Sequence, residues 1–140
     1  MSFSNNDVGA AAIGQKLEVW KGQTKTFDVI AKLNGVPQDV TGKIPYFTAK
    51  ESINSDEAAI AINGTDNPTQ AFVVTPQTGN DVGRVRFVID GSQTQDLCEK
   101  NHVFDAWLTD GGTDRDNIIK APQPGRPGGV MCVYRAVTEF

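Results

Sequence analysis

Runs in which apolar and polar residues alternate occur along most of the chain, and this period of two is typical of strands with one buried face. The segment 26–33 is the clearest example, because every second residue from Phe27 to Leu33 is apolar. It is followed by Asn34-Gly35, a pair favoured in two-residue hairpin turns because both residues tolerate positive φ. A strand that ends in a tight hairpin turn is therefore predicted here.

Three other runs alternate clearly, and four do so more weakly. The clear runs place these residues on their buried faces: Val85, Phe87 and Ile89; Phe104, Ala106 and Leu108; and Val130, Cys132, Tyr134 and Ala136. The weaker runs are 16–20, 44–50, 59–62 and 71–75, and only 55–59 and 94–100 suit a short helix. Seven to eight short strands bounded by turns predict an all-β fold, an antiparallel β-sandwich.

Three segments interrupt the strand pattern. Residues 1–15 are polar and then small and apolar, which predicts an extended N-terminal arm, and residues 63–70 form a polar loop. Residues 111–129 hold five Gly and three Pro around the apolar pair Ile118-Ile119. Loops of this length inside a domain are usually functional or disordered. We therefore expect an arm over 1–15 and a single sandwich domain over 16–140 with an insertion at 111–129.

Composition and charge narrow the range of functions. The chain has 140 residues, 39% of them apolar, which suits one domain with one core. Its net charge of −4 argues against a nucleic-acid partner, because such a protein needs a basic face. No apolar run is long enough to predict a membrane-spanning helix, and the first residues lack the pattern of a secretory signal. A single histidine rules out a multi-histidine metal site, and no cofactor is expected.

A series of turn signatures follows the predicted strands in a fixed order. They are Lys21-Gly22-Gln23-Thr24, Asn34-Gly35-Val36-Pro37, Asp39-Val40-Thr41-Gly42, Phe47-Thr48-Ala49-Lys50, Gly83-Arg84-Val85 and the run from Val103 to Gly111. In this order they resemble the immunoglobulin-like domains of tailed-phage virion proteins, including the N-terminal domain of baseplate upper proteins. The resemblance covers about residues 16–112, so it does not include most of the insertion.

The resemblance implies an immunoglobulin-like sandwich in a structural virion protein, most simply of the tail or baseplate. Its partners would be other virion proteins and copies of itself, and its location the virion, assembled in the host cytoplasm. One position departs from the pattern: Pro45 stands where an inward aliphatic residue is usual. Because proline cannot donate to a ladder, we expect the strand 44–50 to be an edge strand or to begin late.

Two candidate chemistries have simpler explanations. The acidic run from Asp110 to Asp116 could offer oxygens to calcium, but it lacks the glycine position and the distal glutamate of an EF-hand, so a solvated turn is favoured. His102 begins a strand without the nucleophile and orienting partner that catalysis needs, and is expected at the surface or at a strand end. The sequence therefore predicts a protein that is not an enzyme.

The two cysteines, Cys98 and Cys132, do not have the spacing of the antibody disulfide. In a reducing cytoplasm both are expected to be free thiols, with Cys132 as a small core residue.

The two tryptophans are the first candidates for an interface. In the alternation of their strands both Trp20 and Trp107 point away from the core. Each either lies partly covered on its own sheet or anchors a protein interface, where Trp is enriched.

Two further segments could make contacts between molecules. The arm carries the spaced apolar residues Phe3, Val8 and Ile13, and it is either disordered or ordered by lying across a partner. The insertion offers Ile118 and Ile119 together with a stiff Pro-rich stretch.

Two alternatives to a tail or baseplate role remain open. The first is a capsid decoration or head-completion protein, which differs in symmetry and copy number. The second is a carbohydrate-binding or host-adhesion module, which would need exposed aromatic residues lined up as a sugar platform; Trp20, Trp107 and Tyr46 are the available residues.

Overall fold

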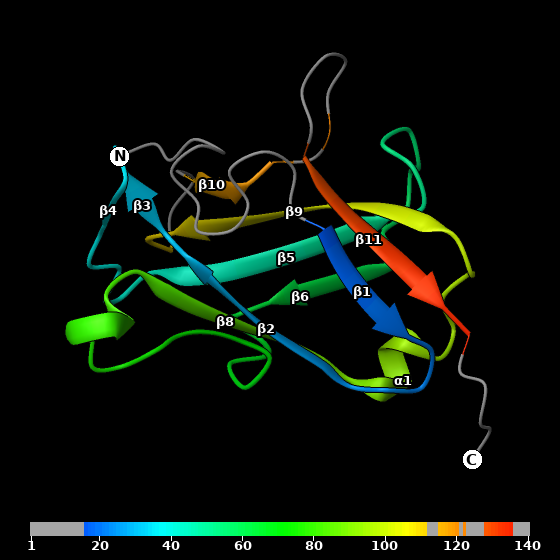
Figure 1. Cartoon of the computed structure of the whole chain (residues 1–140), viewed down its shortest axis with the longest axis horizontal. Helices are drawn as coiled ribbons and strands as arrows, with labels where there is room; N and C mark the ends of the chain where they lie inside the picture. The colour runs from blue at the N-terminus through cyan, green and yellow to red at the C-terminus, as the bar shows by residue number, and fades with distance from the viewer. Residues whose placement is uncertain (1–15, 112–114, 121, 123–127, 136–140) are drawn as a thin grey trace.

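The computed structural model describes residues 16–111, 115–120, 122 and 128–135 (Figure 1). Short helical turns occur at η3 (Gly79–Asp81) and α1 (Gly91–Thr94). The strands are β1 (Lys16–Trp20), β2 (Lys25–Ile30), β3 (Lys32–Leu33), β4 (Val36–Pro37), β5 (Ile44–Lys50), β6 (Ile60–Asn63), β7 (Ala71–Val73), β8 (Arg84–Ile89), β9 (Asn101–Thr109), β10 (Arg115–Ile119) and β11 (Gly129–Tyr134).

The strands form two sheets that pack face to face. The large sheet has the order β1-β11-β9-β5-β6, and β10 also pairs with β9. The small sheet has the order β2-β8-β7, and β3 and β4 form a separate hairpin that continues from β2 (Figure 1). The all-β sandwich predicted from the alternating pattern is confirmed.

Aromatic rings from both sheets meet in the core. The Phe87 ring of the small sheet lies 5.9 Å from the Phe47 ring of the large sheet, and the Phe27 ring lies 6.5 Å from that of Phe104. Such tilted and edge-on pairs add to the free energy gained by burying the rings. The alternation predicted for β8 and β9 is confirmed, because these residues are all buried: Val85, Phe87, Ile89, Phe104, Ala106 and Leu108.

The predicted hairpin turn is also confirmed. Asn34 and Gly35 have φ angles of 54° and 79°, and they join Leu33 to its cross-strand partner Val36. Positive φ at both central residues is the signature of a type I′ turn, whose twist matches that of the flanking strands.

The insertion 111–129 differs from the prediction because part of it is a strand. β10 pairs with the second half of β9 and β11 with the first half, while β5 occupies the other edge. The Gly129 N–H donates to the Lys120 carbonyl oxygen at 2.9 Å, which holds the two ends of the remaining connection together. A Cβ at Gly129 would lie 2.4 Å from the Phe104 carbonyl oxygen, so this close approach requires glycine.

The position of Ile118 and Ile119 corrects their assignment to an interface. Both are buried in the core, with exposed fractions of 0% and 1%. The register between β10 and β9 shifts between Asn117 and Ile119, a bulge that lets two consecutive side chains face inward. This pair fixes the inserted strand to the sandwich.

Three other predictions about the strands were wrong. β1 pairs with β11 in parallel, so the sandwich is not entirely antiparallel. In β11 the residues that join the core are Met131 and Val133, whereas Tyr134 is 38% exposed, so the predicted phase was one residue off. β5 is not an edge strand, because it pairs with both β9 and β6, and Pro45 is its second residue.

The short helices also lie elsewhere than predicted. Residues 55–59 are not helical, and α1 ends at Thr94, where the second predicted stretch begins. Within the described residues, no helix is long and apolar enough to cross a membrane.

Candidate interaction surface

The outer face of the large sheet collects side chains from four neighbouring strands. The register places Tyr46, Thr48 and Lys50 of β5 beside Trp107, Asp105 and Val103 of β9. β11 and β1 continue the face with Val130, Cys132 and Tyr134 beside Lys16, Glu18 and Trp20. We call this the large-sheet face.

Trp107 lies at one end of the large-sheet face and is half-buried between two partners. Its ring stacks on the Tyr46 ring with centroids 4.1 Å apart and planes 7° from parallel. The Arg115 guanidinium carbon lies 5.0 Å from the centroid of the Trp107 ring, within the range of a cation–π contact. Because β5 and β10 flank β9 on opposite sides, these partners cover opposite faces of the indole.

A second aromatic pair lies at the other end of the large-sheet face. The Trp20 and Tyr134 ring centroids are 5.1 Å apart with planes tilted by 37°, and the two residues are cross-strand partners. They are 40% and 38% exposed. Trp20 and Trp107 therefore both point away from the core, as predicted, but Trp20 is the more exposed of the two.

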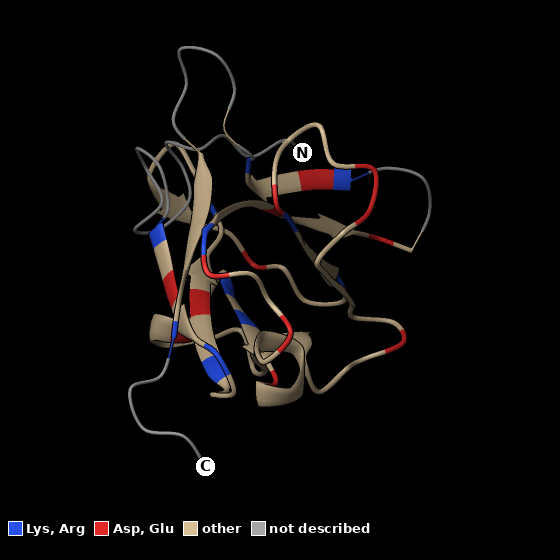
Figure 2. Ribbon diagram, turned by 90° about the vertical axis from the view of Figure 1, so that its right-hand side faces the viewer, with Lys and Arg blue, Asp and Glu red and all other residues tan. Residues whose placement is uncertain are grey.

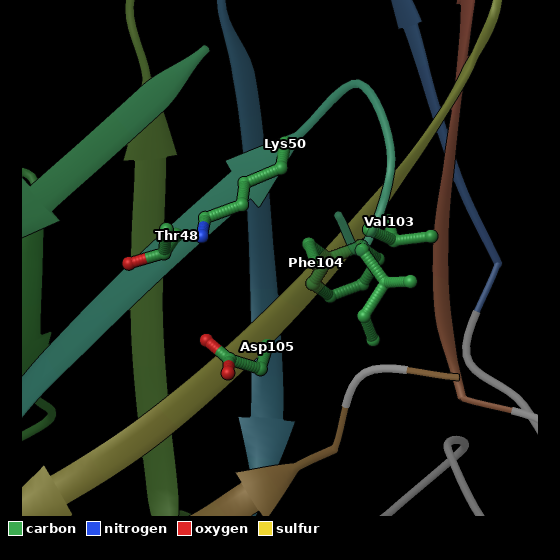
Figure 3. Close-up of a pocket in the computed structure, with 6 residues that line it drawn as sticks. Thr48, Lys50, Val103, Phe104 and Asp105 are labelled. Atoms are coloured by element: carbon green, nitrogen blue, oxygen red, sulfur yellow. The ribbon is translucent and has the colours of Figure 1, made fainter. Parts of the chain in front are cut away.

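A hollow lies between these two aromatic pairs. It is lined by Thr48, Lys50, Ile53, Val103, Phe104 and Asp105 (Figure 3). The Lys50 ammonium and the Asp105 carboxylate extend from neighbouring strands on the same side of the sheet (Figure 3). Ile53, which follows β5, is 48% exposed and adds an apolar side chain to the rim.

Asp105 is the one carboxylate of the hollow, and burial raises its pKa above the ordinary value of 3.8. Arg115 and Lys50 oppose this rise through their charge, but within the described residues neither lies within 4.0 Å as an ion-pair partner of Asp105. A charge that loses water without a close counter-ion is costly. The large-sheet face therefore carries a carboxylate that a cation or a hydrogen-bond donor on another molecule would stabilise.

The outer face of the small sheet, which we call the small-sheet face, is arranged differently. The Asp28 carboxylate accepts hydrogen bonds from Arg86 at 2.8 and 3.0 Å and from Arg84 at 2.9 Å. Arg84 also donates to Asp81 at 3.1 Å. The Arg86 and Arg84 guanidinium groups hold the pKa of Asp28 below its ordinary value. The charges at the centre of the small-sheet face are therefore paired with one another.

Charges of both signs are spread over the described residues. Figure 2 shows Lys and Arg in blue and Asp and Glu in red on strands and loops of the same view. Among the described residues, the ion pairs outside the Asp28 cluster are at least partly exposed, as in Lys16 with Glu18 at 3.5 Å and Lys100 with Glu51 at 3.7 Å. Exposed pairs of this kind contribute little to stability.

His102 is the second residue of β9, so its expected position at a strand end is confirmed, but the side chain is not at the surface and is 1% exposed on the core side of the strand. Its Nδ1 atom lies 3.0 Å from the Lys100 carbonyl oxygen, while the buried Nε2 atom has no partner among the described residues. The ring is held by packing and by one hydrogen bond.

Both cysteines are free in the structure: Cys98 is exposed and Cys132 is buried. The burial of Cys132 was predicted correctly but its face was not, because Met131 and Val133 are the residues of β11 that enter the core.

In the acidic run after β9, one aspartate forms an ion pair with a lysine. Asp110 accepts a hydrogen bond from the Lys43 ammonium, and Asp116 belongs to β10. No group of three metal-ligating side chains occurs among the residues that the structure describes. Phe3, Val8 and Ile13, predicted as contacts of the arm, lie outside those residues.

Sequence reasoning missed several residues of the large-sheet face. Tyr134 was placed on the wrong face of its strand, and Asp105 and Lys50 were not singled out. Arg115 was missed because it follows a glycine-rich segment of the sequence with no alternating pattern. The signal for Asp105 was present in β9, where it lies between Phe104 and Ala106, which are both buried.

The fold and the geometry of the large-sheet face together define an all-β sandwich with an aromatic, partly apolar outer face. No family model matches the chain, and a search of curated proteins finds no significant match to it.

Proposed function

We propose that this protein is a structural component of a tailed-phage virion, in the tail or baseplate. It acts by protein–protein assembly, with the large-sheet face as its contact surface for other virion proteins or copies of itself. The proposal assigns the chain no catalytic step and no cofactor.

The order of the strands supports an immunoglobulin-like relationship. If β2, β5, β6, β7, β8, β9 and β11 are lettered B, C, C′, D, E, F and G, the small sheet reads B-E-D and the large sheet G-F-C-C′. This is the arrangement of variable-type immunoglobulin domains. The insertion interrupts strand G. β10 pairs with one half of strand F and β11 with the other half, so the order of the sheets is unchanged.

The observation that carries the assembly role is the composition of the large-sheet face. Two aromatic pairs flank a hollow that contains Val103, Ile53 and the desolvated Asp105. Protein interfaces combine aromatic anchors with a few polar groups that find their partners only in the complex. The small-sheet face has its central charges already paired and lacks this combination.

At Trp107 the geometry favours assembly over sugar binding. A sugar platform needs an aromatic ring with a free face, whereas Tyr46 and Arg115 cover opposite faces of the Trp107 ring. Trp107 is therefore better suited to being buried edge-on by a protein partner.

The experiment that tests the proposal compares two aromatic-to-alanine variants in particle assembly. Trp107→Ala alters the large-sheet face, and Phe72→Ala, whose register partner is Arg86, alters the small-sheet face. Particles produced with each variant are purified, and the content of the protein is measured by quantitative mass spectrometry. We expect depletion with Trp107→Ala alone. Equal incorporation of both variants, or absence of the wild-type chain from particles, would contradict the proposal.

A further inference from the structure

β2 and β3 form one long strand whose outer edge has no partner among the described residues. The Ala31 N–H donates to the Gly83 carbonyl oxygen, and the Ala31 carbonyl oxygen accepts from the Gln38 N–H. The backbone N–H and carbonyl groups of the odd-numbered residues therefore point toward β8 and the chain that leads from β4. Neighbouring residues of a strand direct their backbone groups to opposite edges. The N–H and carbonyl groups of Thr26, Asp28, Ile30 and Lys32 therefore point to the free edge.

The core is incompletely covered beside this edge. Phe27 points inward and stacks on Phe87 with ring centroids 5.3 Å apart, but Phe27 is only partly buried whereas Phe87 is fully buried. The two are cross-strand partners, so the difference arises from the position of β2 at the end of the small sheet. Another strand along β2 would cover Phe27 as well as pair the free backbone groups.

We propose that a strand from a second copy of this chain, residues 8–13, adds to the free edge of β2 and β3. The sequence Val8-Gly9-Ala10-Ala11-Ala12-Ile13 is uncharged, with small side chains between β-branched ends. Extended segments of this kind bind sheet edges through main-chain hydrogen bonds.

The charges beside the edge do not oppose this strand. Asp28 is neutralised by Arg84 and Arg86, while Lys25 and Lys32 have no ion-pair partner among the described residues. The donated segment carries Asp7 directly before its apolar residues. The edge and the arm are therefore compatible in charge.

The direction of β1 selects a second copy as the donor. The turn at 21–24 joins the end of β1 to the start of β2, and the two strands run in opposite directions across the molecule (Figure 1). The chain that precedes Lys16 therefore leads away from Lys25. To lie beside Thr26 and cover Phe27, a molecule's own arm would have to double back, whereas a neighbour's arm has no such constraint.

Fifteen residues precede β1, and an extended chain spans at most about 3.3–3.6 Å per residue. The arm can thus reach an adjacent molecule while its own β1 stays in place. Two copies that each donate an arm would form a closed, symmetric pair.

The test uses full-length variants in which one half of the contact is altered. Ala11→Pro removes an N–H from the middle of the donated strand, and Ser4→Pro is the matched control outside it. Thr26→Pro removes an N–H that points to the free edge, a position where proline is tolerated. Sedimentation velocity measures association at several concentrations, and hydrogen exchange followed by NMR measures protection of the amides of Thr26, Asp28, Ile30 and Lys32.

We expect the wild type and Ser4→Pro to associate and to protect these amides at least tenfold more strongly at high than at low concentration. Ala11→Pro and Thr26→Pro should each remain monomeric alone and form a mixed complex together, because one has an intact edge and the other an intact arm. If Thr26→Pro does not fold, the wild-type and Ala11→Pro exchange data decide the question.

Three results would overturn the inference: a wild-type monomer at every concentration, association unchanged by Ala11→Pro, or protection that is independent of concentration, which would place the arm on its own molecule. None of these results depends on phage particles. A failure here is thus distinguishable from a failure of the proposed virion role.

Discussion

Asp28 and Asp105 both point outward from the middle of a sheet, but their surroundings shift their pKa values in opposite directions. On the small-sheet face two arginines bind Asp28 directly and lower its pKa. On the large-sheet face burial raises the pKa of Asp105, and its cations, Lys50 and Arg115, lie farther away. A face whose charges are satisfied internally gains little from a partner, whereas a desolvated carboxylate among half-covered aromatic residues gains much.

The largest effect is expected from Trp107→Ala. Loss of the ring removes one of the aromatic anchors of the large-sheet face, and we expect association with its partner to weaken by at least about 2 kcal/mol, or roughly 30-fold. The isolated chain should stay folded because Trp107 lies outside the core cluster. Binding to purified particle components, with Phe72→Ala as control, measures the effect. Unfolding of the variant would show instead that Trp107 is structural.

The next effect concerns the small-sheet face. Asp28→Asn removes the charge that holds Arg84 and Arg86, and should destabilise the fold by about 1–2 kcal/mol, after discounting for the partial exposure of Arg86. Because the pKa of Asp28 is lowered on folding, its stabilisation is complete above the ordinary value of 3.8 and is lost as the pH falls below it. Urea denaturation measures the free energy of unfolding of the wild type and of Asp28→Asn. The difference between them should be clear at pH 7 and smaller at pH 3.

Asp105→Asn should change the stability of the isolated chain in the opposite direction from Asp28→Asn. Because the pKa of Asp105 is raised on folding, its ionised form costs stability at neutral pH, and the cost disappears as the pH falls through the raised value. We expect the variant to stabilise the isolated chain at pH 7, by less than about 1 kcal/mol, and yet to reduce incorporation into particles. Urea denaturation and particle content together measure both effects. A variant that is destabilised at pH 7 would mean that Asp105 has a stabilising partner within its own chain.

The smallest effect is expected from Arg115→Gln. The cation–π contact with Trp107 is half-exposed, so its loss should cost about 0.5–1 kcal/mol of stability. A thermal melt measures the change, and Arg135→Gln, which removes an exposed ion pair with Glu99 at 3.9 Å, serves as the surface control. Equal effects of the two variants would show that the contact contributes nothing.

The sequence predicted those parts of the fold in which one pattern dominates. In β8 and β9 charged residues mark outward positions, at Arg84, Arg86 and Asp105, and the faces of both strands were assigned correctly. Asn34-Gly35 has a backbone preference of its own, so its turn was predictable. β11 was predicted as a strand but with the wrong phase, because apolar residues occupy both faces from Val130 to Val133 and alternation cannot choose between them.

The rest depended on contacts between distant segments. The bulge that turns both Ile118 and Ile119 inward arises from pairing with β9, and the parallel pairing of β1 arises from the position of β11. For the large-sheet face, the outward direction of Trp20 and Trp107 followed from alternation. Tyr46 and Arg115 cover Trp107, and Asp105 is desolvated. Neither feature could be predicted without the register of three strands.

The central claim, that the large-sheet face binds other virion components, is tested most directly by a reconstruction of the intact particle by electron microscopy. We predict density for this chain in the tail or baseplate, with a neighbouring protein packed on Trp107, Tyr134 and the Asp105 hollow, and a cationic or hydrogen-bond-donating group beside Asp105. A particle in which the chain is present but the large-sheet face is exposed to solvent would contradict the claim.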